Sequence, residues 1–384
     1  MHLVTKKKVP VFLGSSFAFL GGYAAIAPNG EAELLPYACV GVACAGLVYL
    51  ILSFIIKAYG QKKVMRFFPP IVTGPIIIAI GLCLSGSAIQ NCSANWLIAL
   101  VAIVVVIVCN IWGKGMIKII PILLGVVVSY ILAVIVDPAS RAAVATAVKE
   151  AAWFGLPVKM ENTVFGLFSG EVDSGLIAKA IITIVPISLA TMMEHIGDIS
   201  AISSTVGKNF IEDPGLHRTL IGDGVGTAIA ALFGAPANTT YGENTGVLVL
   251  TKVYDPFVVK IAACFSIFLS FCPKFAALIT AMPSATIGGV SIILYGMIAS
   301  VGIRNMVENG TNFQESRNVI IAALIMGLTI GVEYSNAGVI SFGSISLSGL
   351  AVASIVGIVL NAILPGKDAA FADEPKDAGS LGKF

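Results

Sequence analysis

Hydrophobic residues in this chain gather into long runs that short polar segments separate. Twelve runs have about the length of a helix that crosses a bilayer, roughly 17–25 residues. They lie near residues 10–28, 36–57, 67–86, 95–112, 116–136, 176–202, 218–234, 236–252, 257–272, 280–303, 317–334 and 345–364. The pattern predicts an all-α polytopic membrane protein. The more polar segment 137–175 is expected to carry a surface helix over Ala139–Phe154.

Composition supports a membrane protein. Hydrophobic residues make up 57% of the chain and charged residues 11%, whereas soluble domains carry roughly 25% charged residues. The net charge of +2 gives no sign of a nucleic-acid partner. The sequence has no metal-ligand cluster, GxSxG or glycine-rich phosphate loop, so we predict neither an enzyme nor a cofactor nor a metal.

Basic residues predict the orientation of the chain. Lys and Arg precede the first run, follow the second and fourth, and flank the loops after the sixth and tenth. Because basic loops stay in the cytoplasm, both ends of the chain are expected on the cytoplasmic side of the cell membrane. The segment 137–175, with three basic residues, is the exception and is expected outside.

One stretch, Gly234–Gly246 (GAPANTTYGENTG), interrupts an apolar region. Pro236 removes a backbone donor and disfavours a continuous helix. Irregular backbone at membrane depth is tolerated only where protein buries it or where it lines a cavity. An acidic residue there, Glu243, is a functional-site hypothesis by default. We therefore expect half of a solute site in this stretch.

An internal repeat organises the chain. Phe68–Gly74 matches Met282–Gly288, and the break at Leu13–Phe19 matches the break at Asn238–Glu243. Each pair is seven spans apart, an odd number, so the two copies point in opposite directions across the membrane. Inverted repeats with broken helices at matching places indicate a secondary transporter, although a glycine kink explains a single break equally well.

The two copies are unequal. The second has two runs, 176–202 and 218–234, ahead of its broken element, and the first has none. A symmetric protein would have seven plus seven spans, whereas this chain has five plus seven.

Four motifs carry a resemblance to a known family. They are Val9–Phe19 (VPVFLGSSFAF), Glu194–Gly197 (EHIG), Asp213–Arg218 (DPGLHR) and Asn238–Gly246 (NTTYGENTG). With them the chain resembles the nucleobase/ascorbate transporter family, in particular its bacterial uracil permease branch. Purine branches usually carry Gln where this chain has Glu243.

The resemblance implies fourteen spans in two inverted sevens, with two short antiparallel strands at the midplane. It implies core-domain parts at 1–57 and 176–272 and gate-domain parts at 58–136 and 273–364. The segment 137–175 becomes an extracellular connection and 365–384 a cytoplasmic tail. The family's first two spans have no counterpart here, so we expect an N-terminally incomplete core domain.

The resemblance also assigns site residues. It implies that Glu194 binds the ring edge of uracil and that Glu243 binds beside it and couples a proton. Backbone groups of Phe17, Tyr241 and Gly242 are expected to contact the base. The chemistry fits, because carboxylates make strong charge-assisted hydrogen bonds to ring N–H groups. The alternative is that both glutamates pair with buried lysines.

Three other polar residues are expected to have supporting roles in coupling or packing. Asp198 lies one turn after Glu194 on the same helix face and is expected to assist proton coupling. His195 is interpreted as a packing or tuning residue with a possible share in the coupling, and Asp223 as a helix-packing position.

The sequence therefore predicts a proton-coupled uracil permease of the bacterial cytoplasmic membrane. Its expected partners are uracil, protons, the lipid bilayer and, as an open option, a second copy in a homodimer. Alternatives are a permease for another nucleobase such as xanthine, an anion transporter of similar architecture, or a non-transporting truncated fragment. Proton and sodium coupling are not distinguished.

Overall fold

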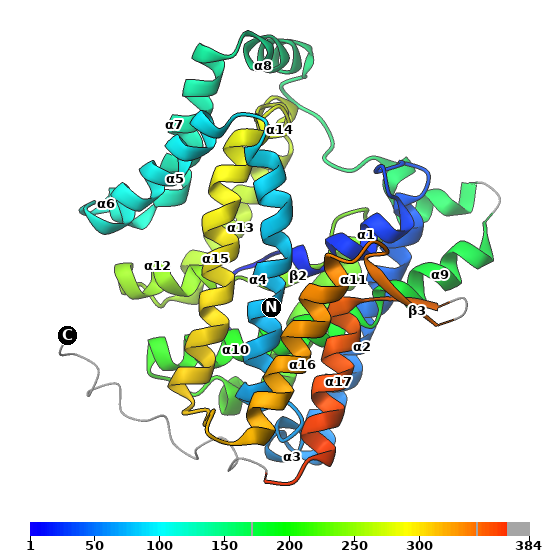
Figure 1. The fold of residues 1–384 in the computed structure, drawn as a ribbon. Helices are drawn as coiled ribbons and strands as arrows, with labels where there is room; N and C mark the ends of the chain where they lie inside the picture. The colour runs from blue at the N-terminus through cyan, green and yellow to red at the C-terminus, as the bar shows by residue number, and fades with distance from the viewer. Residues whose placement is uncertain (170–171, 343–344, 367–384) are drawn as a thin grey trace.

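The computed structural model describes residues 1–169, 172–342 and 345–366, and its described part is mostly helical (Figure 1). The first half of the chain forms β1 (Leu13–Ser15), η1 (Phe17–Phe19), α1 (Leu20–Ile26), α2 (Leu35–Tyr59), α3 (Gln61–Met65), α4 (Pro70–Cys92), α5 (Trp96–Ile111), α6 (Met116–Ile119), α7 (Pro121–Val136), α8 (Pro138–Glu150), η2 (Met160–Asn162) and η3 (Val164–Ser169).

The second half repeats the mixture of long helices and short broken elements. It forms α9 (Ser174–Ile184), α10 (Ile187–Val206), η4 (Ile211–Gly215), α11 (Leu216–Leu232), β2 (Asn238–Thr240), α12 (Glu243–Thr251), α13 (Pro256–Ser270), α14 (Pro273–Thr280), α15 (Ser284–Glu308), α16 (Ser316–Glu333), β3 (Val339–Phe342), β4 (Ile345–Ser348) and α17 (Gly349–Ile363).

The two strands β1 and β2 meet in the middle of the molecule, as predicted. They pair antiparallel, with Leu13 opposite Thr240 and Ser15 opposite Asn238. Figure 1 shows β2 lying between the α4 and α15 side and the α2 and α11 side. Each strand leads into a short helix, β1 into η1 and α1, and β2 into α12. The breaks satisfy their backbone groups by pairing with each other, which is what burial at membrane depth demands.

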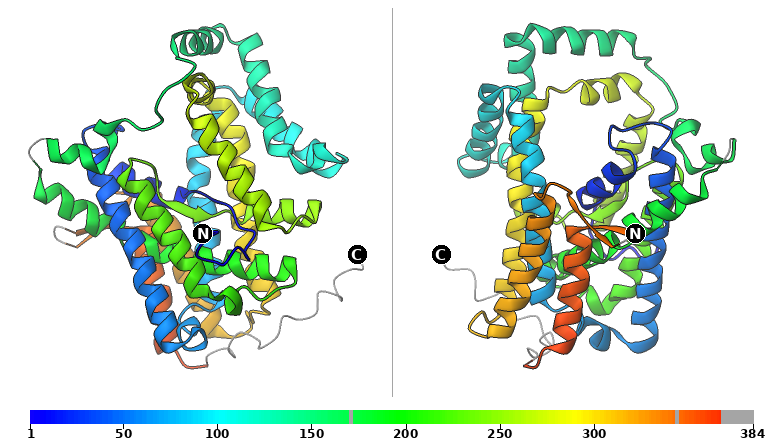
Figure 2. Two further views of the ribbon diagram at one scale, coloured as in Figure 1. Left: turned by 180° about the vertical axis from the view of Figure 1, so that it is seen from behind. Right: turned by 45° about the vertical axis from the view of Figure 1, so that its right-hand side comes forward.

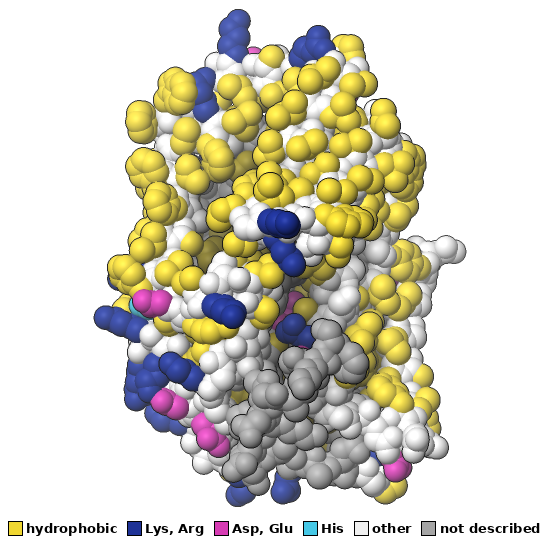
Figure 3. Space-filling model, turned by 90° about the vertical axis from the view of Figure 1, so that its left-hand side faces the viewer, with side chains coloured by type: hydrophobic (Ala, Val, Ile, Leu, Met, Phe, Trp, Pro, Cys, Tyr) yellow, Lys and Arg dark blue, Asp and Glu magenta, His cyan; other side chains and the backbone are white. Residues whose placement is uncertain are grey.

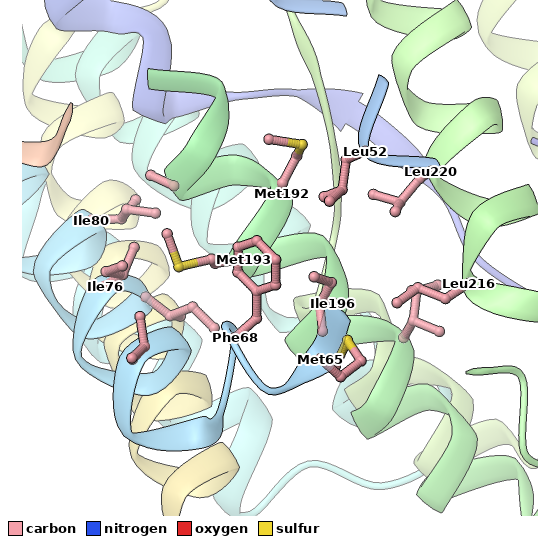
Figure 4. Close-up of a cluster of buried hydrophobic side chains, with 14 of the residues drawn as sticks. Leu52, Met65, Phe68, Ile76, Ile80, Met192, Met193, Ile196, Leu216 and Leu220 are labelled. Carbon is pink, nitrogen blue, oxygen red and sulfur yellow. The ribbon is translucent and has the colours of Figure 1, made fainter. Parts of the chain in front are cut away.

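Helix α10 lies at the centre of the hydrophobic core. Its Met192, Met193 and Ile196 are at most 2% exposed. Figure 4 shows these side chains between residues of α4 on one side and Leu52, Leu216 and Leu220 on the other. Because α10 is buried on every side in this region, a polar residue on it is held within protein rather than in lipid.

Helices α4 and α15 cross with their backbones in contact. A methyl group on Gly81 would lie 2.4 Å from the carbonyl oxygen of Tyr295, and one on Gly302 would lie 2.6 Å from that of Gly74. Only glycine permits such an approach. The sequence-matched segments at Phe68–Gly74 and Met282–Gly288 lead into these two helices.

The spans are less regular than the apolar runs. Among the described residues, five helices are long and apolar enough to cross a membrane, or up to seven if each bent pair is one span. Several runs are shorter as helices because strands occupy part of them, as β2 does in the run 236–252. The number twelve stays a prediction.

Two peripheral features complete the fold. Helix α8 lies across one end of the molecule, bent by 109° from α7, which confirms the expected surface helix (Figure 2). A second hairpin, β3 with β4, precedes α17, where the sequence predicted the start of the last span. Figure 3 shows hydrophobic side chains covering the upper part of one face, with basic side chains at its top, across its middle and in its lower part.

Candidate functional site

The broken helices meet beside a cavity of about 230 Å³. Its lining residues come from η1, α10, β2 and α12, from the turn before α12, and from α4, α7 and α15. The lining residues are Phe17, Ala18, Ile80, Ile122, Glu194, Thr239, Thr240, Tyr241, Asn244, Leu294 and Ile298. Drug-sized ligands occupy pockets of about 300–1,000 Å³, so this cavity suits a smaller molecule.

Glu194 supplies the carboxylate of the cavity. It projects from α10 and is 8% exposed. The hydroxyl of Thr239 on β2 donates a hydrogen bond to its Oε2 at 3.0 Å. This bond fixes the orientation of the Glu194 carboxylate on α10 relative to β2.

Tyr241 fastens the two strands together. Its hydroxyl donates to the carbonyl of Ser15 at 3.1 Å, and its backbone N–H donates to the carbonyl of Phe12 at 3.1 Å. Its ring lies over Gly14, where a methyl group would come within 2.3 Å of ring carbon Cζ. The N–H of Tyr241 is therefore bonded within the protein in this structure, and the predicted contact of its backbone with a base stays a prediction.

Gly14 and Tyr241 give a matched test of the strand pair. Gly14→Ala should displace the Tyr241 ring and lower uptake of the transported solute by about 5–150-fold, because overpacking costs about 1–3 kcal/mol. The control is Gly21→Ala on α1, where an added methyl meets nothing within 4 Å. Uptake is compared at equal amounts of protein in the membrane. Equal uptake by both variants would show that the ring does not position the strands.

Gly242 and Asp198 are in close contact. A methyl group on Gly242 would lie 2.5 Å from Oδ1 of Asp198, which is 2% exposed. The turn that opens α12 therefore lies directly on this carboxylate. The side chain of Glu243, the first residue of α12, lies outside the described residues, so its proposed link to Asp198 stays a prediction.

His195 follows Glu194 on α10 but does not line the cavity, and it is fully buried. Its Nε2 is 2.9 Å from the hydroxyl of Thr219, which itself donates to a backbone carbonyl. Nε2 must therefore carry a hydrogen and donate to Thr219. Its Nδ1 is 2.8 Å from the hydroxyl of Thr240 and 3.0 Å from Oδ2 of Asp223.

Asp223 has more than the packing role expected from the sequence. It is fully buried, and within the described part of the chain neither of its oxygens has a hydrogen-bond partner. Its Oδ2 lies 3.0 Å from Nδ1 of His195, so the two side chains form one buried polar cluster next to β2. Thr240, which contacts His195, also lines the cavity.

Removing one member of this cluster should cost stability. We expect His195→Leu to destabilise the protein by about 1–3 kcal/mol, because it leaves the buried carboxyl group of Asp223 without the polar ring that faces it. The double variant His195→Leu/Asp223→Leu should recover part of that loss, because replacing both partners leaves no buried polar group of this pair without its partner. Melting temperatures in detergent measure both effects. A double variant less stable than the single one would contradict the pairing.

Aromatic and aliphatic residues complete the cavity. The ring of Phe17 meets the ring of Tyr295 edge to face, with centroids 5.3 Å apart and planes at 76°. The aliphatic wall comes from Ile80 of α4, Ile122 of α7, and Leu294 and Ile298 of α15. Phe17, Glu194 and Tyr241, which the sequence analysis expects at a binding site, line the cavity. The aliphatic wall was not predicted, because aliphatic residues in an apolar helix carry no local signal.

Comparison with known proteins matches this chain to a family of permeases. The family model described as "Permease family" matches residues 1–338. The "Uracil permease" of Bacillus caldolyticus is 38% identical over 374 residues, covering 95% of this chain and 83% of that protein. The "Uracil permease" of Bacillus subtilis (strain 168) is 37% identical over 376 residues, with 94% and 83% covered. That of Escherichia coli (strain K12) is 35% identical, with 94% and 81% covered.

Solved structures share the fold at low sequence identity. The transmembrane domain of a cyanobacterium bicarbonate transporter, BicA, has a TM-score of 0.54 and 14% identity, covering 92% of this chain and 85% of that one. The structure of SLC26A9 has a TM-score of 0.55 and 12% identity, covering 93% and 57%. Both matches concern the fold alone.

Proposed function

Because the chain belongs to the permease family that matches its residues 1–338, we propose that it is a uracil permease that imports uracil across the cell membrane by alternating access. The relatives named uracil permease, at 35–38% identity over nearly the whole chain, support uracil over xanthine or an anion. A transporter, rather than an enzyme, is what such a family implies.

The observation that carries the proposal is the position of Glu194. Its carboxylate lies in the wall of a small cavity, beside the ends of two broken helices. Uracil is flat and neutral, with two ring N–H donors and two carbonyl acceptors. A carboxylate accepts from the N–H groups more strongly than a neutral group does.

The carbonyl oxygens of the base need partners as well. The short helices η1 and α12 begin at the cavity, and Phe17 and Asn244 of these helices line it. A helix N-terminus carries a partial positive charge that favours electron-rich oxygens. Broken helices of transporters use their ends for this purpose. Glu194 and these helix ends together provide both kinds of partner.

We further propose that Glu243 couples transport to a proton, with Asp198 beside the same turn. Burial penalises the charged form of a carboxylate, so proton binding lets the loaded site change its exposure more readily. One proton that moves down 100 mV supplies about 2.3 kcal/mol. At about 1.4 kcal/mol per tenfold, that energy sustains roughly 50-fold accumulation.

The proposed architecture has a core domain that carries α10, β1 and β2, and a gate domain that carries α4, α7 and α15. Inverted seven-span repeats and cytoplasmic chain ends belong to the same proposal, supported by the matched segments and by the basic loops. The aliphatic side of the cavity then belongs to the gate and its polar side to the core.

Uptake of labelled uracil tests the proposal directly. The chain is expressed in a bacterium that lacks its own uracil uptake, and entry of labelled uracil and of labelled xanthine is measured. We expect saturable uracil entry that an inward proton gradient increases, and little xanthine entry. Entry of xanthine in preference to uracil would reject the proposed substrate. Uracil entry that does not depend on the proton gradient would reject the proposed coupling.

A further inference from the structure

We propose that the aliphatic wall of the cavity faces the C5–C6 edge of the base and decides which ring substituents are admitted. The wall comprises Ile80, Ile122, Leu294 and Ile298. The inference deepens the proposed function and rests on it: if the substrate is uracil, these four side chains set its tolerance for a methyl group at C5.

The polar and most of the aliphatic groups of the cavity come from different elements. The polar side chains Glu194, Thr239, Thr240 and Asn244 come from α10, β2 and the start of α12. Apart from Ala18 of η1, the aliphatic ones come from α4, α7 and α15, and none of them can donate or accept a hydrogen bond. A ligand in the cavity therefore meets hydrogen-bonding groups from one set of elements and hydrocarbon from another.

Uracil has the same asymmetry. Its N1–H, C2=O, N3–H and C4=O groups follow one another around the ring, whereas C5–H and C6–H form one continuous apolar edge. Burying a polar group against hydrocarbon without a hydrogen bond is costly. A placement that avoids that cost directs the polar atoms at Glu194 and the strands and the C5–C6 edge at the isoleucines and the leucine.

The wall has little freedom to retreat. Leu294 and Ile298 are four residues apart and lie on the same face of α15. Ile80 is 3% exposed and precedes Gly81, where the backbones of α4 and α15 touch. Tyr295, between the two wall residues of α15, holds the edge-to-face contact with Phe17. Because the helices are already in backbone contact, the size of the wall side chains decides how much room remains.

A methyl group at C5 should therefore be poorly tolerated. One methyl group more or less in a hydrophobic pocket changes discrimination by about 10–200-fold. We expect thymine, which is 5-methyluracil, to bind more weakly than uracil within that range. A methyl on the polar edge, as in 3-methyluracil, should be rejected for another reason, the loss of an N–H donor.

Two wall variants and one control test this arrangement. Leu294→Ala and the milder Ile298→Val enlarge the wall side of the cavity, and Ile303→Ala shortens a residue of the same helix that is 51% exposed. Dissociation constants for uracil, thymine and 3-methyluracil are measured on purified protein by competition with labelled uracil. We expect the thymine-to-uracil ratio to fall about tenfold or more in Leu294→Ala and less in Ile298→Val.

The thymine-to-uracil ratio of dissociation constants should stay unchanged in Ile303→Ala, and 3-methyluracil should remain excluded in every variant. Equal binding of thymine and uracil by the unaltered protein, or an unchanged ratio in both wall variants, would overturn the inference while leaving a uracil permease intact. Admission of 3-methyluracil instead of thymine would show that the base lies the other way round. Failure of the unaltered protein to bind uracil would overturn the proposed function, and the inference with it.

Discussion

Replacing Glu194 by alanine is expected to weaken uracil binding by about 10–150-fold. The variant removes the acceptor that Thr239 orients and leaves a ring N–H of the base without its charged partner. A hydrogen bond to a charged group contributes about 1.5–3 kcal/mol, and each 1.4 kcal/mol is a factor of ten in affinity. Calorimetry with uracil on detergent-purified protein measures the loss.

The matched control removes a glutamate away from the cavity. Glu308→Ala deletes the partner of Arg304 in a half-exposed pair on α15, and such surface pairs contribute little. Its affinity for uracil should equal that of the unaltered protein. A loss of less than threefold in Glu194→Ala, with folding intact, would remove Glu194 from the binding site.

Replacing Glu243 by glutamine is expected to abolish accumulation of uracil against its gradient while leaving exchange of uracil in place. The glutamine keeps the shape and hydrogen-bonding capacity of the side chain but cannot take up the coupling proton. The roughly 50-fold accumulation that one proton sustains at 100 mV should then fall to none. Glu243 opens α12 directly after the turn that lies on Asp198, so the substitution falls where the two broken helices meet.

Proteoliposomes separate the two activities. Uphill uptake is measured with an imposed pH gradient, and exchange of labelled for unlabelled uracil is measured with no gradient. Glu308→Gln serves as the control and should retain both. Continued uphill uptake by Glu243→Gln would assign the coupling to another group, with Asp198 and the His195 cluster as the next residues to substitute.

Sequence and structure agree best where the chemistry of single residues is decisive. Pro236 and the neighbouring glycines predicted a break in the helix, and the structure has β2 there. Glu194 stood out as a carboxylate within an apolar run, and it lies in the cavity wall. Such signals are local, because a proline or a charge disturbs a membrane helix wherever the rest of the chain lies.

The partners of residues that are distant in sequence could not be predicted. His195 was interpreted as a packing or tuning residue and Asp223 as a packing position, and the structure shows that the two form one buried cluster that also contacts Thr240. Nothing in the sequence around either residue indicates the other. The hairpin of β3 and β4, by contrast, is a local structure that occupies the start of a predicted span.

The sequence by itself determined the class of protein, the places where its helices break and the acidic residues at those breaks. These follow from the free energy of moving each residue out of water, which depends on composition and on local backbone chemistry. Only the tertiary structure decided that Leu13 pairs with Thr240, and that α4, α7 and α15 supply aliphatic side chains to the cavity that Glu194 lines. Those side chains resemble every other lipid-facing or buried residue of their helices, and only the packing of distant helices selects the few that line the cavity.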